Sequence, residues 1–312
     1  MHTLERRGDV DDAVGQLVTR AVLGRRGMGM NAINAALAAG TLVRVRKGIY
    51  LPGELARSLS RWDKDLVALH AHARAARNPP VFVGASAARL WNLDVWPADR
   101  SIHLLERGTN RSNTHGPPVT CHDLTMRSGE LTALRGLRVT TLERTVVDCI
   151  RTFEIASGVI LADSALRRGV SKEALGAALG DSTGTRGTVR AAQVLALADG
   201  RSESVAEGRL RVLMHVWGLP APVLQYEVAT ARHRYRLDMA WPDIGRAVEV
   251  HGNGKYFQYM ETSEKLLRER KREAELAETG ITVLNVWWEQ LRRPDLRTRL
   301  LRHLAPLLEQ PG

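Results

Sequence analysis

The sequence predicts an α/β protein of several domains. Three observations support this prediction. The chain has 312 residues, enough for two or three domains with a sizeable core. Segments with helical periodicity are interspersed with short alternating segments typical of strands. Residues 181–201 begin as a Gly/Thr/Ser-rich linker and continue into a short helix. The predicted domains are 1–55 and 56–180 before this linker and 202–312 after it.

The first domain begins with two short helices and a hairpin. Thr19 is placed to cap a helix that ends near Gly27, and a second helix runs from Met30 to Gly40. The segment "LVRVRKGIYL" alternates like a strand and bends at Lys47-Gly48. This order predicts a winged helix-turn-helix that binds DNA.

Basic and amide side chains mark the expected DNA contacts of that domain. Those facing the major groove would be Arg25, Arg26, Asn31 and Asn34, and those along the phosphates would be Arg44, Arg46 and Lys47. The alternative is a small helical domain with a solvated basic hairpin.

The middle domain is expected to have an α/β fold. "PPVFVGASAARLWNLDVWP" predicts a strand and a helix, three short strands follow, and amphipathic helices end the block. His103, His115 and His122 lie here, and no pair of them has the i, i+4 spacing of a helical metal site. We interpret them as loop or core residues.

The third domain predicts the order helix, three strands, helix, strand. Its strands are "VLQYEVA", "HRYRLDMAW", "RAVEVHG" and "ITVLNVWW". Because strand residues alternate between faces, Asp238 on the second strand and Glu249 with His251 on the third are expected on one polar face. Carboxylates of this kind suit Mg²⁺ or Mn²⁺, although a solvated polar face is the alternative.

The long charged helix of this domain carries a basic stripe. Lys265, Arg268 and Arg272 follow the i, i+3, i+7 spacing and could lie along a DNA backbone. The alternative is a solvated face supported by pairs such as Glu264 with Arg268.

This element order resembles the core of the PD-(D/E)xK nuclease superfamily, in particular its members related to very-short-patch repair endonucleases. The resemblance implies that Asp238 and Glu249 hold a divalent metal, that Glu207 is the supporting acid of the first helix, and that His251 stands where Lys is commonest. Lys255, in "GKY", would then reach a phosphate. Many relatives carry E-x-D-G where this chain has "EVHG", so the family mechanism does not transfer directly.

Residues 14–178 resemble AbiEi-type antitoxins and related regulators. The resemblance lies in "INAALAAGTLVRVRKGIY", "ASAARLWNLDVWP", "GLRVTTLERTVVDCIR" and "ADSALRRGVS". It implies a transcriptional autorepressor from a toxin-antitoxin or phage-defence module, with a cognate toxin as a candidate partner and a homodimer as a candidate assembly.

Charge and cysteine content narrow the expected partners. A net charge of +11 and a pI near 10.3 favour polyanionic partners, with nucleic acid first and an anionic membrane surface as the alternative. The predicted winged helix favours double-stranded DNA among the nucleic acids. No apolar segment reaches the roughly 18 residues that span a bilayer, the N-terminus lacks an apolar signal core, and two cysteines fit a reducing cytoplasm. We therefore expect a DNA-binding protein with a candidate Mg²⁺-dependent DNA endonuclease domain. The alternatives are a non-catalytic repressor and an RNA-directed nuclease.

Overall fold

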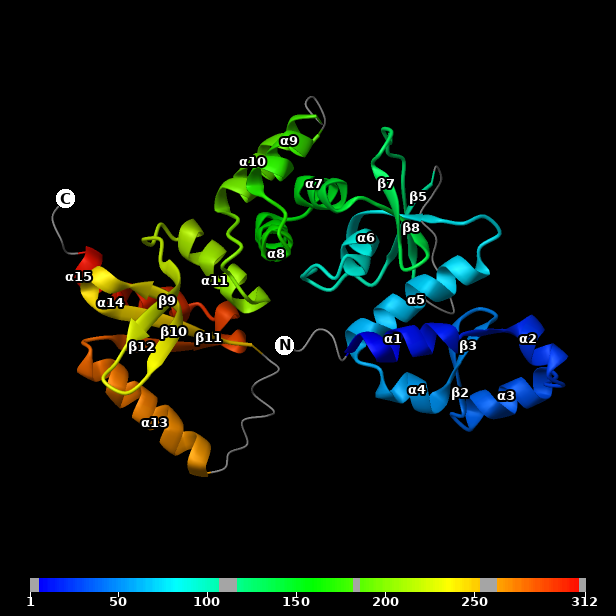
Figure 1. Ribbon diagram of the computed structural model, residues 1–312, viewed down its shortest axis with the longest axis horizontal. Coiled ribbons are helices and arrows are strands. Elements are labelled where there is room, and N and C mark those ends of the chain that lie inside the picture. Colours follow the sequence, from blue (N-terminus) through cyan, green and yellow to red (C-terminus); the bar gives the residue numbers. More distant parts are fainter. Residues whose placement is uncertain (1–5, 107–116, 182–185, 253–262, 309–312) are drawn as a thin grey trace. The chain divides into compact units, whose positions relative to one another are not determined.

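The computed structural model describes residues 6–106, 117–181, 186–252 and 263–308, with the side chains of 6–9 and 263–266 left aside. The chain divides into two compact units, Met1–Cys149 and Ile150–Gly312, each described by itself below. Helices and three sheets fill the described residues (Figure 1), which confirms the α/β class. Within these residues no helix is long and apolar enough to cross a membrane.

Unit 1 begins with a small helical layer on a three-stranded sheet. Its elements are α1 (Arg6–Gly15), β1 (Val18–Thr19), α2 (Arg20–Arg25), α3 (Met30–Ala38), β2 (Leu42–Arg46) and β3 (Ile49–Pro52), with antiparallel strand order β1-β3-β2. Thr19 caps α2 as predicted, because its Oγ1 accepts the Val22 N–H at 3.2 Å. Leu23, Ile33 and Tyr50 form the core beneath α3.

A five-stranded mixed sheet completes unit 1. Its strands are β4 (Val81–Phe82), β5 (Ile102–Leu105), β6 (Val119–His122), β7 (Leu131–Leu134) and β8 (Leu137–Thr140), in the order β6-β5-β4-β8-β7. Three further helices belong to this unit: α4 (Gly53–Ser58), α5 (Arg61–Ala75) and α6 (Gly84–Leu90). Leu69 of α5 packs with Phe82, Ile102 and Val139 of the sheet, so α5 shares its core.

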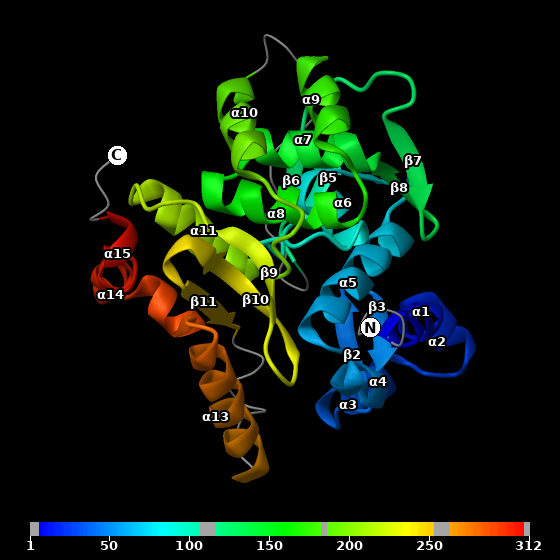
Figure 2. The ribbon, with the colours of Figure 1, turned by 60° about the vertical axis from the view of Figure 1, so that its left-hand side comes forward.

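A helical layer opens unit 2. After α7 (Leu142–Thr152) come α8 (Ile155–Arg167), α9 (Lys172–Gly180), α10 (Thr188–Leu197) and α11 (Val205–Val216) (Figure 2). A Cβ on Gly158 of α8 would meet Val194 Cγ2 of α10 at 2.9 Å, so the two helices need a glycine at this contact. Helix α10 lies inside residues 181–201, for which the sequence predicts a linker that continues into a short helix.

A four-stranded sheet forms the remainder of unit 2. Its strands are β9 (Val223–Ala229), β10 (Arg234–Trp241), β11 (Arg246–His251) and β12 (Thr282–Trp287), in the order β12-β11-β10-β9. Strands β9 to β11 are antiparallel, whereas β12 is parallel to β11. Helix α13 (Ser263–Glu278) precedes β12. A 3-10 turn η1 (Pro242–Ile244) joins β10 to β11, and η2 (Trp288–Arg292), α14 (Asp295–His303) and α15 (Ala305–Leu308) end the unit.

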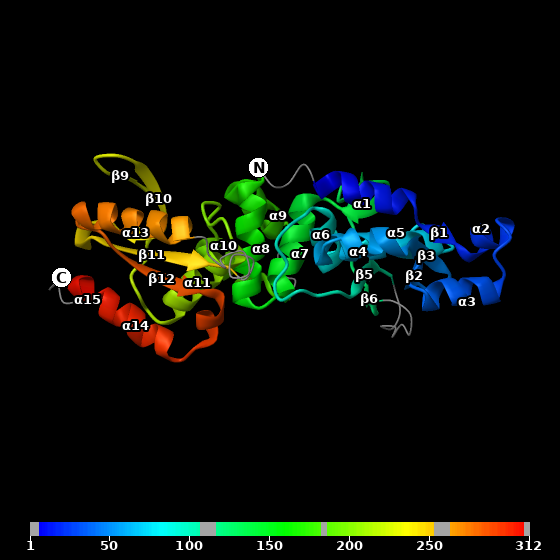
Figure 3. The same ribbon diagram turned by 90° about the horizontal axis from the view of Figure 1, so that it is seen from below.

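Helices cover both faces of this sheet. Leu210 of α11 and Leu300 of α14 pack with Met239 and Val248 on one face. On the other face, Leu276 of α13 packs with Leu237. Figure 3 shows α13 and α14 on opposite sides of the strands.

The regular alternation of side chains expected along β10 is wrong at one point. Leu237 packs with Ala240 on the α13 face, whereas Met239 packs with Trp241 on the other face. The face therefore switches at Asp238. Gln225, which lies opposite Asp238 in β9, has φ of +52°, a left-handed conformation that interrupts the pleat of its strand. The predicted single polar face of Asp238, Glu249 and His251 thus does not form by simple alternation.

Candidate functional site

Three carboxylates and one histidine of unit 2 come from elements that adjoin the point where β10 and β11 separate. Glu207, Glu249 and His251 are buried, and Asp238 is half-buried. Helix α11 supplies Glu207, β10 supplies Asp238, and the end of β11 supplies the other two. A buried carboxylate is costly unless a cation or hydrogen-bond donors compensate its charge, so the partners of each group decide what this site can do.

Asp238 takes the place of a backbone partner in the sheet. The regular pairing of β10 with β11 runs from Trp241↔Arg246 to Met239↔Val248. One residue further, Asp238 Oδ2 accepts the backbone N–H of Val250 at 2.9 Å. The carboxylate therefore lies between the two strands where their ladder ends.

Glu207 lies in the first turn of α11, close to Asp238. Its Oε2 accepts the backbone N–H of Glu203 at 2.9 Å and the Nε2–H of Gln225 at 3.0 Å. Burial raises the pKa of Glu207, and the negative charge of Asp238 raises it further. A cation placed between the two carboxylates would remove that repulsion.

Glu249 is engaged by α13. Arg272 Nη1 donates to Glu249 Oε2 at 2.9 Å, and Nη2 donates to Oε1, which makes a bidentate salt bridge. This hydrogen bond raises the pKa of Arg272. The residue predicted as a metal ligand and the residue predicted as a DNA contact therefore bind each other.

His251 is oriented by two residues of β12. Its Nε2 lies 2.8 Å from Asn285 Oδ1, and its ring stacks on Trp287 with centroids 4.3 Å apart. Because an amide oxygen accepts, Nε2 carries the proton and Nδ1 of the neutral ring keeps its lone pair. Nδ1 is buried and has no hydrogen-bond partner among the described residues.

Sequence reasoning could not identify three residues of the site. They are Gln225, Asn285 and, as the partner of Glu249, Arg272. Gln225 comes from the first strand, and its contact to Glu207 depends on a left-handed backbone that no residue pattern predicts. Asn285 lies directly opposite Glu249 in the parallel register of β11 and β12. Only the polarity of Asn285 inside the apolar strand "ITVLNVWW" could have signalled it.

The donor set suits a hard divalent cation in part. Among the residues that the structure describes, no three His, Cys, Asp or Glu side chains lie close enough to hold a metal. Mg²⁺ usually takes only one or two protein carboxylates and completes its shell with water and phosphate oxygens. Glu207 and Asp238 meet that need, whereas Glu249 is bound to Arg272. Lys255 lies outside the described residues, and so does the side chain of Lys265.

The predicted DNA-contact residues of unit 1 fall into two groups. Exposed side chains are those of Arg25, Arg26, Asn31, Asn34 and Lys47. Arg44 and Arg46 are half-buried: the Arg44 guanidinium lies 5.9 Å from the Tyr50 ring centroid, and Arg46 contacts His72. In unit 2, Arg268 is exposed.

A basic pocket adjoins the β2–β3 hairpin. It measures about 790 Å³, and its lining includes four cationic side chains, namely Arg46, Lys47, Arg77 and Arg138, with Glu106 as an acidic one. Such a lining suits an anionic ligand.

Of the three histidines considered in the middle domain, His103 and His122 form a cluster that the sequence pattern did not predict. His103 is buried, with Nε2 2.7 Å from Asp99 Oδ2 and Nδ1 2.8 Å from His122 Nε2. The i, i+4 spacing here joins His103 to an aspartate, Asp99, and not to a second histidine, so spacing between histidines gave no signal of it. His115 lies outside the described residues.

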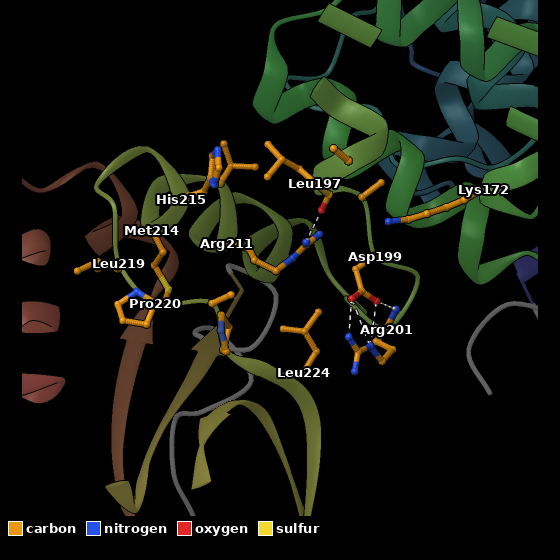
Figure 4. A pocket seen from close by; sticks show the side chains of 15 residues that line it. Lys172, Leu197, Asp199, Arg201, Arg211, Met214, His215, Leu219, Pro220 and Leu224 are labelled. Carbon is orange, nitrogen blue, oxygen red and sulfur yellow. Dashed lines mark hydrogen bonds and ion pairs between the residues drawn. The ribbon is translucent and has the colours of Figure 1, made fainter. Parts of the chain in front are cut away.

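A separate pocket of about 290 Å³ lies in unit 2 (Figure 4). Asp199 and Arg201 form an ion pair at its side, and Arg211 donates to the Leu197 carbonyl at 2.6 Å. The acidic site, which consists of Glu207, Asp238, Glu249 and His251, contributes no residue to its lining. The pocket is therefore distinct from the acidic site, although α11 contributes to both.

Comparison with known proteins identifies relatives that match most of the chain. No model of a known protein family matches the chain. Two Mycobacterium tuberculosis proteins, Rv2248 of strain H37Rv and MT2308 of strain CDC 1551 / Oshkosh, are each 31% identical over 272 residues, which covers 85% of this chain and 93% of the relative. The chain belongs to their family. Both relatives are described as uncharacterized, and the match is longer than either compact unit, so the family combines both units.

A solved structure gives a more distant match. The crystal structure of the RV2827C protein from Mycobacterium tuberculosis is 20% identical, with a TM-score of 0.39, and the match covers 70% of this chain and 86% of that one. At this TM-score the likeness carries no argument about fold or function.

Proposed function

We propose that unit 2 is a divalent-cation-dependent DNA endonuclease, and that unit 1 binds duplex DNA through a winged helix-turn-helix. The observation that carries the proposal is a pair of carboxylates whose charges interact, Glu207 and Asp238. Asp238 lies where β10 and β11 separate, and Gln225, opposite it in β9, donates to Glu207. Two neighbouring carboxylates repel each other, and a hard cation is the ligand that uses them.

The topology of unit 2 supports the resemblance to PD-(D/E)xK nucleases. Helix α11 precedes an antiparallel meander of three strands, and α13 leads to a fourth strand parallel to the third. In the resemblance, the helix acid, the first strand acid and the second strand acid correspond to Glu207, Asp238 and Glu249. These three residues and His251 come from three neighbouring elements of this arrangement.

The chemistry assigned to the residues follows from their contacts. A bound cation would be held by Asp238 and Glu207, joined by Glu249 once Arg272 releases it, and would supply positive charge against the phosphate. His251 offers Nδ1 as a proton acceptor, because Asn285 holds the proton on Nε2. Stacking on Trp287 fixes the plane of the imidazole ring.

DNA binding by unit 1 is supported by its element order and its charge. The order α1, β1, α2, α3, β2, β3 is that of a winged helix, and Asn31 and Asn34 lie exposed on α3, the helix expected in the major groove. The basic pocket beside the hairpin and the net charge of +11 favour phosphate contacts.

The test is nicking of supercoiled plasmid with Mg²⁺, Mn²⁺ or EDTA. We expect metal-dependent nicking by the wild type, slowed roughly a hundredfold or more in Asp238→Asn and Glu207→Gln, because charge stabilisation by the cation contributes several kcal/mol. Asp243→Asn, an exposed carboxylate of η1, is the matched control and should cut like the wild type. Equal cleavage by wild type and Asp238→Asn would contradict the proposed site.

A second candidate function is a non-catalytic regulator of the AbiEi type. The salt bridge between Arg272 and Glu249 favours it, since it neutralises an acid that a nuclease would use. This function predicts tight binding to a discrete operator near the protein's own gene, with a cognate toxin as partner, and no cleavage under any metal. A footprint without nicking would select it.

A further inference from the structure

The contact between Arg272 and Glu249 joins α13 to the acidic site. Both oxygens of Glu249 accept from the two terminal nitrogens of Arg272, and the carboxylate is buried. Arg272 also donates to Glu269 at 3.2 Å, and its guanidinium lies 5.5 Å from the Tyr235 ring centroid. The guanidinium therefore has three neighbours among the described residues, Glu249, Glu269 and Tyr235.

This contact opposes binding of a divalent cation to Glu249. The guanidinium already compensates the negative charge of that carboxylate, and a dication on the same oxygens would lie beside a fixed positive charge. Glu207 differs, because its Oε2 accepts hydrogen bonds from two neutral groups, the Glu203 backbone N–H and the Gln225 Nε2–H. The salt bridge thus leaves Glu207 and Asp238 available to a cation and keeps Glu249 bound to Arg272.

Contacts other than the Arg272 salt bridge also attach α13 to the sheet. Glu275, one turn further along the helix, accepts hydrogen bonds from Thr230 Oγ1 at 2.9 Å and from Tyr235 Oη at 3.1 Å, which ties the helix to the β9–β10 hairpin. The Arg272 side chain itself keeps 22% of its surface exposed. Arg270 and Lys271, its neighbours along the helix, are exposed cations.

We propose that Arg272 is an exchangeable counter-ion, which transfers from Glu249 to a backbone phosphate of bound nucleic acid and thereby couples duplex binding to cation binding. A guanidinium makes the same two-pronged contact with a phosphate as with a carboxylate, so the exchange preserves its hydrogen bonds. Glu249 is then released to join Glu207 and Asp238. This coupling rests on the function proposed above.

The test measures Mn²⁺ affinity from the electron paramagnetic resonance signal of free Mn²⁺, with and without a phosphorothioate-protected duplex. In the wild type we expect the duplex to tighten Mn²⁺ binding about tenfold, within the usual range of coupling between two sites. Arg272→Gln should bind Mn²⁺ about tenfold tighter than the wild type without duplex, and the duplex should add less than about twofold. Arg270→Gln, an exposed arginine of the same helix, should behave like the wild type.

Removal of a buried ion pair can destabilise the fold, so circular dichroism and a second variant accompany the titration. Arg272→Lys keeps the charge but not the two-pronged guanidinium, and it should give intermediate coupling. If Mn²⁺ binds and the duplex effect is the same in wild type and Arg272→Gln, the exchange is wrong and the cation site stands. If no variant binds Mn²⁺ with or without duplex, the cation site itself is wrong, and the exchange with it.

Discussion

At the residue scale, Gln225 shows why the site could not be placed from strand alternation alone. It is a non-glycine residue with φ of +52° inside a strand, opposite Asp238, and its side chain donates to Glu207. A left-handed conformation costs an L-residue about 1–2 kcal/mol, so the surrounding structure must stabilise it. The sequence identified Asp238, Glu249, His251 and Glu207 as candidates, but not the irregularity that arranges them.

Substitution of Gln225 separates backbone strain from its hydrogen bond. Gln225→Ala and Gln225→Gly both remove the hydrogen bond to Glu207, but only glycine adopts this φ without strain. We therefore expect the glycine variant to be more stable than the alanine variant by about 1 kcal/mol. Urea unfolding measures the difference, and an alanine variant as stable as the glycine variant would show that the backbone there is not strained.

His122 makes the stability of unit 1 depend on pH. Burial lowers the pKa of His122, and the charge of His103 lowers it further, so the fold favours neutral His122. This stabilisation is complete above the ordinary histidine pKa near 6.5 and is lost as pH falls below it. His70, whose pKa burial also lowers, acts in the same direction. We expect the urea midpoint to fall between pH 7.5 and 5, with a smaller fall in His122→Gln.

At the element scale, the packing of α8 against α10 depends on Gly158. A Cβ there would lie 2.9 Å from Val194 Cγ2, and Val194 is fully buried and stiff at χ1. Gly158→Ala should therefore lower the free energy of unfolding by about 1–3 kcal/mol through overpacking. Gly176 of α9 has open space at its Cβ, so Gly176→Ala is the control and should stabilise by about 0.5–1 kcal/mol. Thermal unfolding measures the stability of both variants. A Gly158→Ala variant as stable as the wild type would mean that α8 and α10 can move apart to accommodate the added methyl group.

The elements themselves were largely predictable because their signals are local. Thr19 caps α2, and the alternation in "LVRVRKGIYL" corresponds to β2 and β3. The partners of Glu249 and His251 were not predictable, because they are distant in sequence. Arg272 lies 23 residues from Glu249 and meets it through the position of α13. Asn285 lies 34 residues from His251 and meets it through the parallel pairing of β11 and β12. The short helix expected after the Gly/Thr/Ser residues corresponds to α10, whereas its packing against α8 could not be predicted from local signals.

At the scale of the whole molecule, the net charge of +11 predicts a duplex affinity that depends strongly on salt. Removing one cation that binds a phosphate should reduce the slope of log K against log salt by about one. Lys47 is exposed on the β2–β3 hairpin, so Lys47→Ala should weaken binding of any duplex sequence and reduce the slope by this amount. Lys172→Ala removes the same charge at an exposed position of α9 in unit 2 and should leave the slope within error. Fluorescence anisotropy between roughly 50 and 200 mM salt, a range in which phosphate-driven affinity falls steeply, measures both. Equal slopes for the two variants would mean that net charge, and not the hairpin, determines where unit 1 meets DNA.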